Sequence, residues 1–218
     1  MPYEDAIYAF PAASHPGGHD SFPPSKTGRE RTCYLVFAGR RHLHHPGILR
    51  LHYLYLGGEG CGDFLLGEES RIVPLHPGQL LAVPPKMLCG CLTDSGMIYT
   101  EIILKKENFT MNNILKAGQP TELKDLISYE DGSIANLDLV HADNMKFVLM
   151  AFDEGTGLTP HRAPGNAILT ALEGKAIIGY EGQDYELAAG QSFRFDKNGL
   201  HSVTAQGKFK MSLLLVIE

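Results

Sequence analysis

Short apolar stretches separated by glycine and proline recur along most of the chain. From Cys33 onward they read CYLVFAG, ILRLHYLYLGG, DFLLG, SRIVPL, GQLLAVPP and MIYTEIIL. From Ile134 the pattern resumes as IANLDLV, KFVLMAF, AILTALEG, KAIIGYEG, DYELAAG, QSFRF, HSVTA and FKMSLLLVI. Stretches of this length, bounded by turn residues, are typical of strands in all-β sandwiches and barrels. The pattern therefore predicts two consecutive all-β domains.

The pattern changes between Glu107 and Ile127. There FTMNNILKA and PTELKDLI place apolar residues three or four positions apart and contain good helix formers, which predicts two short helices. The first thirty residues mix Pro, Gly, Ser and His without a sustained period. We therefore expect an irregular N-terminal arm over 1–30, a first barrel over 31–106, a linker with short helices over 107–130 and a second barrel over 131–218.

The two predicted barrels share an internal repeat. GQLLAVPPKMLC, from Gly78 to Cys89, and GQSFRFDKNGLH, from Gly190 to His201, open with the same dipeptide and have the same length. Upstream, YLGGEG and ALEGKA precede matching pairs of strands. We expect the two barrels to superpose with Gly78 on Gly190 and Cys89 on His201.

These residues are also where the chain resembles a known family, the cupin superfamily. PHRAPGNAILTALEG, residues 160–174, resembles the first cupin motif, and GQSFRFDKNGLH resembles the second. The resemblance implies two tandem double-stranded β-helix (jelly-roll) barrels. The C-terminal half is similar to small single-domain bacterial cupins. The N-terminal half, through HHPGILRLHYLYLGGEG and PGQLLAVPP, resembles the sensor barrel of AraC-type regulators, although a second barrel stands where those regulators have their DNA-binding helices.

The cupin resemblance implies a metal site in the second barrel. Cupin sites use imidazoles of the first motif, a carboxylate and the histidine of the second motif, so His161 and His201 are retained here. Ala163 occupies the position of the second imidazole, and Asn166, with Ala167 beside it, that of the acid. A site of His161, His201 and Asn166 would hold one divalent ion such as Fe, Ni, Zn or Mn, without the charge compensation of a carboxylate. The alternative is two histidines that are hydrogen-bonded inside an apolar cavity.

The first barrel departs further from the motif, because Cys89 replaces the histidine. A site of His44, His52 and Cys89 is conceivable, but a degenerate barrel is favoured. Cys89 and Cys91 share a strand face and are interpreted as ordinary buried thiols. The acids Glu101, Glu173 and Asp196 are interpreted as surface or turn residues.

The composition of the chain limits the partners and the cellular location that we expect. The chain has 25 acidic and 19 basic residues, a net charge of −6 and no long basic run, which disfavours binding to nucleic acid. No leader-like or membrane-length apolar segment is evident, and the four cysteines are interpreted as reduced thiols. We expect a cytoplasmic protein without a membrane partner.

Three functions stay open from the sequence. The first is a small-molecule-binding protein, whose ligand could be a carbohydrate. The second is a metal-dependent isomerase or dioxygenase acting on a small polar or enolic substrate. The third is a structural or interaction protein without catalysis. Because strand edges need partners, we also expect a homodimer or pairing of the two barrels within one chain.

Overall fold

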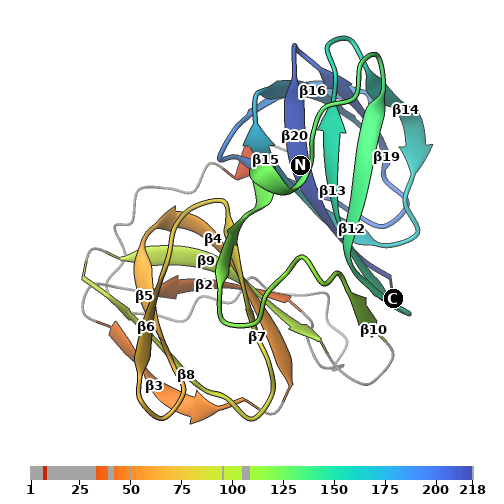
Figure 1. Cartoon of the computed structure of the whole chain (residues 1–218). Helices are drawn as coiled ribbons and strands as arrows, with labels where there is room; N and C mark the ends of the chain where they lie inside the picture. Colours follow the sequence, from red (N-terminus) through yellow and green to blue (C-terminus); the bar gives the residue numbers. More distant parts are fainter. Residues whose placement is uncertain are drawn as a thin grey trace. The chain divides into compact units, whose positions relative to one another are not determined.

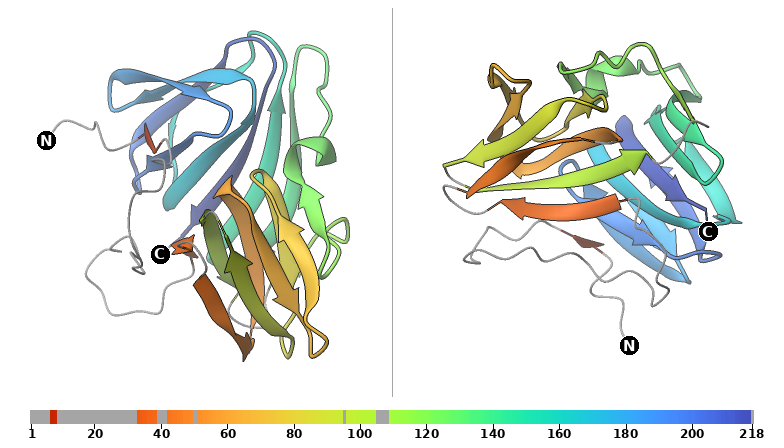
Figure 2. Two further views of the ribbon diagram at one scale, coloured as in Figure 1. Left: turned by 90° about the vertical axis from the view of Figure 1, so that its left-hand side faces the viewer. Right: turned by 90° about the horizontal axis from the view of Figure 1, so that it is seen from below.

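The structure of the chain is a computed structural model that describes residues 49, 51–94, 96–104 and 109–217, together with the backbone of 7–8, 33–38 and 42–48. Contacts divide the chain into two compact units. The C-terminal unit comprises Met1–Ala9, Asn108–Asn112 and Leu123–Glu218, and the N-terminal unit comprises Phe10–Glu107 and Asn113–Glu122. Figures 1 and 2 show each unit as two facing layers of strands.

The C-terminal unit consists of a 7-stranded sheet with the order β1-β18-β15-β20-β13-β12-β10 and a 4-stranded sheet with the order β14-β19-β16-β17. All of its strand pairs are antiparallel. Its strands are β1 (Ile7–Tyr8), β10 (Phe109–Met111), β12 (Ile134–Ala142), β13 (Met145–Phe152), β14 (Gly157–Arg162), β15 (Asn166–Glu173), β16 (Lys175–Tyr180), β17 (Gln183–Ala188), β18 (Ser192–Phe195), β19 (Leu200–Ala205) and β20 (Phe209–Val216).

The N-terminal unit consists of a 5-stranded sheet with the order β11-β7-β4-β9-β2 and a 4-stranded sheet with the order β3-β8-β5-β6. Its strands are β2 (Cys33–Ala38), β3 (His42–Ile48), β4 (His52–Gly60), β5 (Gly62–Leu66), β6 (Arg71–Leu75), β7 (Gln79–Val83), β8 (Leu88–Thr93), β9 (Met97–Leu104) and β11 (Pro120–Glu122). Apart from the added edge strands, this topology repeats that of the C-terminal unit: β7-β4-β9-β2 matches β18-β15-β20-β13, and β3-β8-β5-β6 matches β14-β19-β16-β17.

The repeat extends to the β-bulges. The register of β4 on β9 shifts between Gly57 and Glu59, and that of β15 on β20 shifts between Ala171 and Glu173. The register of β3 on β8 shifts between His44 and Gly47, and that of β14 on β19 shifts between Leu158 and His161. Each bulge lies at the matching place of its unit, and Cys89 and His201 are both the second residue of their strands. The predicted all-β jelly-roll fold is confirmed.

Each unit encloses an apolar core between its two sheets, as the alternating strand patterns require. In the C-terminal unit the core includes Phe152, Leu169, Ile178, Phe193 and Phe209, each 0% exposed. The core of the N-terminal unit contains Tyr55, Phe64, Tyr99, Cys89 and Cys91. The N-terminal core is thus richer in polar side-chain atoms.

The prediction of two short helices between residues 107 and 130 is wrong. FTM forms β10, which pairs with β12, and PTE forms β11, which pairs with β7. Within this predicted linker the described helical structure is the 3₁₀ turn η2 (Leu123–Leu126). Helices this short gain few internal hydrogen bonds and are marginal in water, whereas a free sheet edge offers ready partners to the same backbone. An apolar period of three or four residues in so short a segment is therefore a weak predictor of a helix.

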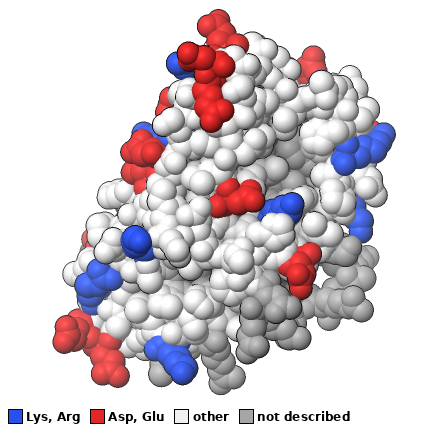
Figure 3. All heavy atoms as spheres, turned by 45° about the vertical axis from the view of Figure 1, so that its right-hand side comes forward, with Lys and Arg blue, Asp and Glu red and all other residues white. Residues whose placement is uncertain are grey.

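Charged side chains on the surface are mixed in sign. Figure 3 shows Lys and Arg scattered among Asp and Glu on the face it draws. Exposed pairs such as Lys175–Glu186, at 3.1 Å, and Arg194–Asp196, at 2.9 Å, join the two signs locally. No helix in the described part of the chain is long and apolar enough to cross a membrane.

Two glycines at equivalent places close the bulged hairpins. Gly60 and Gly174 have φ angles of 69° and 76°, and a Cβ at either would overlap a backbone carbonyl oxygen, that of Gly96 or of Lys208. Only glycine combines this left-handed conformation with so close an approach of two chains. The Glu-Gly ends of the two repeats are therefore required by the backbone.

Gly174→Ala should destabilise the protein far more than Gly182→Ala. Gly182 also has a positive φ, of 82°, but has no neighbouring atom within 4 Å of its would-be Cβ, so alanine there adds only backbone strain of about 1 kcal/mol. Alanine at position 174 adds the overlap with Lys208, and we expect a loss of at least about 3 kcal/mol. Urea unfolding of both variants measures the difference, and equal losses would contradict this account of the hairpin.

Candidate functional site

The two histidines that match the cupin-like motifs face each other across neighbouring strands. His161, near the end of β14, and His201, at the start of β19, are cross-strand partners. Their ring centroids are 4.3 Å apart, with an angle of 54° between the ring planes. The bulge between Leu158 and His161 sets this register. The structure thus brings together the two residues that the sequence singled out.

Both imidazoles are oriented by the same local contact. His161 Nδ1 lies 2.8 Å from the carbonyl oxygen of Thr159, and His201 Nδ1 lies 2.9 Å from that of Gly199. A carbonyl oxygen only accepts hydrogen bonds, so Nδ1 must carry the proton and donate it. In the neutral rings, Nε2 is then the unprotonated nitrogen with a free lone pair. The pair therefore offers two acceptor atoms.

The two rings differ in their surroundings. His201 is 7% exposed and its ring stacks on Phe195, with centroids 4.2 Å apart and an interplanar angle of 26°. Burial lowers the pKa of His201 from its ordinary value of 6.5, and the nearby His161 lowers it further, while the hydrogen bond to Gly199 opposes the change. His161 is exposed. The site thus combines a buried neutral imidazole with one that solvent reaches.

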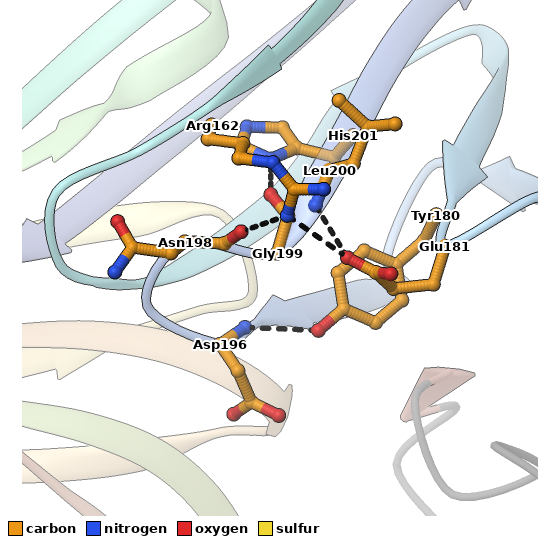
Figure 4. Close-up of polar contacts among 8 residues, drawn as sticks. All are labelled: Arg162, Tyr180, Glu181, Asp196, Asn198, Gly199, Leu200 and His201. Carbon is orange, nitrogen blue, oxygen red and sulfur yellow. Dashed lines mark hydrogen bonds and ion pairs between the residues drawn. The ribbon is translucent and has the colours of Figure 1, made fainter.

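The turn that delivers His201 is held on its inner side by Tyr180. The backbone N–H of Asp196 donates to Tyr180 Oη at 3.3 Å, and Gly199 lies so close to the Tyr180 ring that a Cβ there would approach it to 2.6 Å (Figure 4). Asn198 has a φ of 62° and donates its N–H to the carbonyl oxygen of Ala163 at 2.9 Å. These contacts fix the carbonyl of Gly199 to which the His201 ring donates.

A second set of contacts holds the same turn. The backbone N–H of Leu200 donates to Glu181 Oε1 at 2.6 Å, and the guanidinium of Arg162 lies 3.5 Å from the same oxygen (Figure 4). Arg162 also donates to the carbonyl oxygen of Asn198. Arg162 follows His161 on β14 and points to the opposite face of the strand, so we assign it to holding the turn.

Asn166 makes its own contact with the backbone. Its Oδ1 accepts the backbone N–H of Lys197 at 3.0 Å. Strand alternation places Asn166 on the face of β15 opposite to Ala167 and Leu169, which belong to the apolar core. The interior position nearest to the expected acid is therefore Ala167, whose side chain is a methyl group. The period-two pattern that Ala167 shares with Leu169 and Ala171 was the sequence signal for this assignment.

The matching positions of the N-terminal barrel carry no imidazole. Cross-strand partners Gly47 and Cys89 occupy the places of His161 and His201. Burial raises the pKa of Cys89 to about 11 and that of Cys91 to about 12, so both thiols stay protonated at neutral pH. The side chain of His44 lies outside the described residues, which leaves the conceivable His44, His52 and Cys89 site as a sequence-based expectation. Cys61, Cys89 and Cys91 form no disulfide.

Comparison with known proteins agrees with this architecture. Residues 148–217 match the family model described as a cupin domain. This part of the chain is therefore similar to a cupin domain. A conserved-barrel cupin protein from Leptotrichia buccalis is similar to the chain at 23% identity and a TM-score of 0.72, over 86% of this chain and 85% of that one.

A salicylate 1,2-dioxygenase from Pseudaminobacter salicylatoxidans is also similar, with a TM-score of 0.61 and 13% identity over 85% of this chain and 71% of that one. No curated protein matches the chain. At these identities the solved cupin structures establish the fold, and function must be argued from the site itself.

Phe195→Leu should raise the pKa of His201 toward 6.5. The smaller side chain removes the ring that stacks on the imidazole and lets water approach it, which relieves the desolvation that lowers the pKa. An NMR pH titration of the ring protons measures the change. Phe152→Leu, a change in the same core around the Phe152–Phe209 pair, is the control and should leave the titration of His201 as it is. A His201 pKa that falls or stays constant in the Phe195 variant would contradict this assignment.

Proposed function

We propose that the C-terminal cupin domain binds a small neutral ligand rich in hydroxyl groups, such as a carbohydrate or another polyol, at His161 and His201. The observation that carries the proposal is that both Nδ1 atoms are used by backbone carbonyls, so that both rings present Nε2 as an acceptor. Two adjacent acceptors match two hydroxyl donors of one molecule. Neutral imidazoles in this tautomer do not offer donors to an anion.

The surroundings suit such a ligand. His201 is backed by Phe195 and the apolar core, which excludes water from one side of the site. His161 is exposed, which lets a ligand approach from solvent. Hydrogen bonds gain strength where water is excluded, so Nε2 of the largely buried His201 would supply most of the selectivity.

The donor set does not fit a resident metal ion. Two imidazoles would bind, but Asn166 is engaged with Lys197 and the interior position beside it is the methyl of Ala167. The described residues contain no group of three or more His, Cys, Asp or Glu arranged to hold a metal. A dication held by two neutral ligands would carry its charge uncompensated next to an apolar core.

A metal-dependent isomerase or dioxygenase is thus the weaker candidate, and the similarity to a salicylate 1,2-dioxygenase supports the shared fold alone. The third possibility, a barrel that only provides an interaction surface, predicts that no small molecule uses the histidine pair. The two candidates for a small-molecule site differ in whether a metal ion is needed.

Neutral monosaccharides and polyols should bind to the wild-type protein with the histidine pair intact. Saturation-transfer NMR against a panel of these compounds measures binding without assuming which one is preferred. His161→Ala and His201→Ala should each lose the signal, because each removes one acceptor. His141→Ala, a change of an exposed histidine on β12 of the same unit, is the matched control and should retain it. Melting curves establish that each variant is folded, and binding that survives in folded His161 and His201 variants would refute the proposal.

Ala167→Glu should increase the affinity of the site for a divalent metal ion. A carboxylate at this interior position supplies the missing anionic ligand, and we expect at least about a tenfold gain in affinity for Zn²⁺ or Fe²⁺. Asn166→Glu is the matched control: it adds the same charge on the other face of β15 and should change metal affinity much less. Titration calorimetry and the rise in melting temperature with metal report the result. Tight one-to-one binding by the wild type that depends on His201 would favour the enzyme instead.

A further inference from the structure

The N-terminal barrel carries a carboxyl group on its inner face. Glu101 lies on β9 with the same alternation as Met97 and Tyr99, both of which belong to the core between the two sheets. Its cross-strand partner on β4 is Tyr55, which is also a core residue. The interpretation of Glu101 as a surface residue is therefore wrong, because its strand position directs it into the barrel.

This carboxyl has no counterpart in the C-terminal barrel. Tyr55 and Glu101 lie two residues from the bulge of β4 on β9, and the equivalent pair on β15 and β20 is Leu169 and Leu213. The C-terminal barrel thus has two aliphatic side chains at these positions, and the N-terminal barrel has a phenol and a carboxylic acid. A packed core would gain nothing from this exchange, since a buried carboxyl is costly unless it has a partner.

No described residue supplies that partner. None of the described ion pairs or hydrogen bonds involves the Glu101 carboxyl. Burial raises its pKa to about 7, with no basic side chain acting in the opposite direction. The ionised form is therefore poorly compensated, and a cation brought by a ligand would compensate it.

Aromatic rings flank the same carboxyl. Tyr55 packs against Phe64, with centroids 4.7 Å apart, and against Tyr99 at 5.7 Å, and Tyr53 stacks on Tyr55 at 6.0 Å. The faces of such rings attract organic cations. Burial raises the pKa values of Tyr55 and Tyr99 above their usual range, and Cys89, whose Sγ lies 4.0 Å from Tyr55 Oη, stays a thiol. Near neutral pH, these neighbours remain neutral and Glu101 is the group that titrates.

We propose that the N-terminal barrel binds an organic cation, an amine or quaternary ammonium compound, with Glu101 as its counter-charge and the rings of Tyr53, Tyr55 and Tyr99 around it. Glu101 and Tyr53 are partly exposed, whereas Met97 and Tyr99, further along the same inner face, are 2% and 3% exposed. Solvent thus reaches Glu101 and Tyr53 and hardly reaches Met97 and Tyr99. The proposal is independent of the ligand at His161 and His201, which belongs to the other unit.

The probe is choline, compared with 3,3-dimethyl-1-butanol, which has the same shape without the charge. Titration calorimetry at about pH 8, where Glu101 is ionised, should detect choline and give a binding constant for the neutral alcohol at least about tenfold weaker. At about pH 5.5 the carboxyl is protonated, and choline binding should weaken by about tenfold or more.

Glu101→Gln keeps the shape of the side chain and removes its charge, so it should weaken choline binding at least about tenfold and abolish the pH dependence. Glu69→Gln, a change of an exposed carboxylate in the same unit, is the matched control. It should leave the choline affinity and its pH dependence unchanged. Tyr99→Leu should weaken choline binding and Tyr99→Phe should retain it, because the ring and not the hydroxyl meets the cation. The proposal is overturned if choline fails to bind, if the neutral alcohol binds equally well, or if a folded Glu101→Gln variant binds choline like the wild type.

Discussion

The candidate site depends on one bulge in an antiparallel strand pair. Side chains alternate along a strand, so the register of β14 on β19 decides which residues face each other inside the barrel. The shift between Leu158 and His161 brings His161 opposite His201, and the i−2 carbonyls then hold both rings by Nδ1. A slip by one residue would turn His161 to the other face and leave His201 alone beside Phe195. The geometry of the pair is thus a property of the backbone register.

The two barrels show how the same backbone supports different chemistry. Both have the same strand order and the same two bulges, yet the paired positions hold His161 and His201 in one barrel and Gly47 and Cys89 in the other. The N-terminal barrel also has polar side chains at Tyr55 and Glu101, where the C-terminal barrel has leucines. The two barrels therefore place different polar side chains at equivalent positions. This difference is consistent with the two separate ligands proposed above.

Much of this organisation was predictable from the sequence, because it follows from periodicity. Alternating apolar residues and glycine-bounded turns predicted the strands, and the equal spacing of Gly78–Cys89 and Gly190–His201 predicted the repeat. The wrong predictions arose where the sequence pattern is local but the structure is decided by contacts with residues that are distant in the sequence. The segments at β10 and β11 have some helical period, but sheet edges far away in sequence provide their hydrogen bonds. A single acid in an apolar stretch does not reveal which face of its strand is enclosed, so the sequence alone predicts Glu101 at the surface. Motif matching assigns Asn166 to the position of the acid, whereas strand alternation places Ala167 on the interior face.

The central claim is that the two imidazoles face the ligand as neutral hydrogen-bond acceptors. A neutron crystal structure of the C-terminal site at neutral pH, with a bound polyol found by the NMR screen, tests it most directly because it locates the protons. We predict a deuteron on Nδ1 of both His161 and His201, none on either Nε2, and ligand hydroxyls donating to both Nε2 atoms. A deuteron on Nε2 of His201, or a ligand bound away from the pair, would contradict the account.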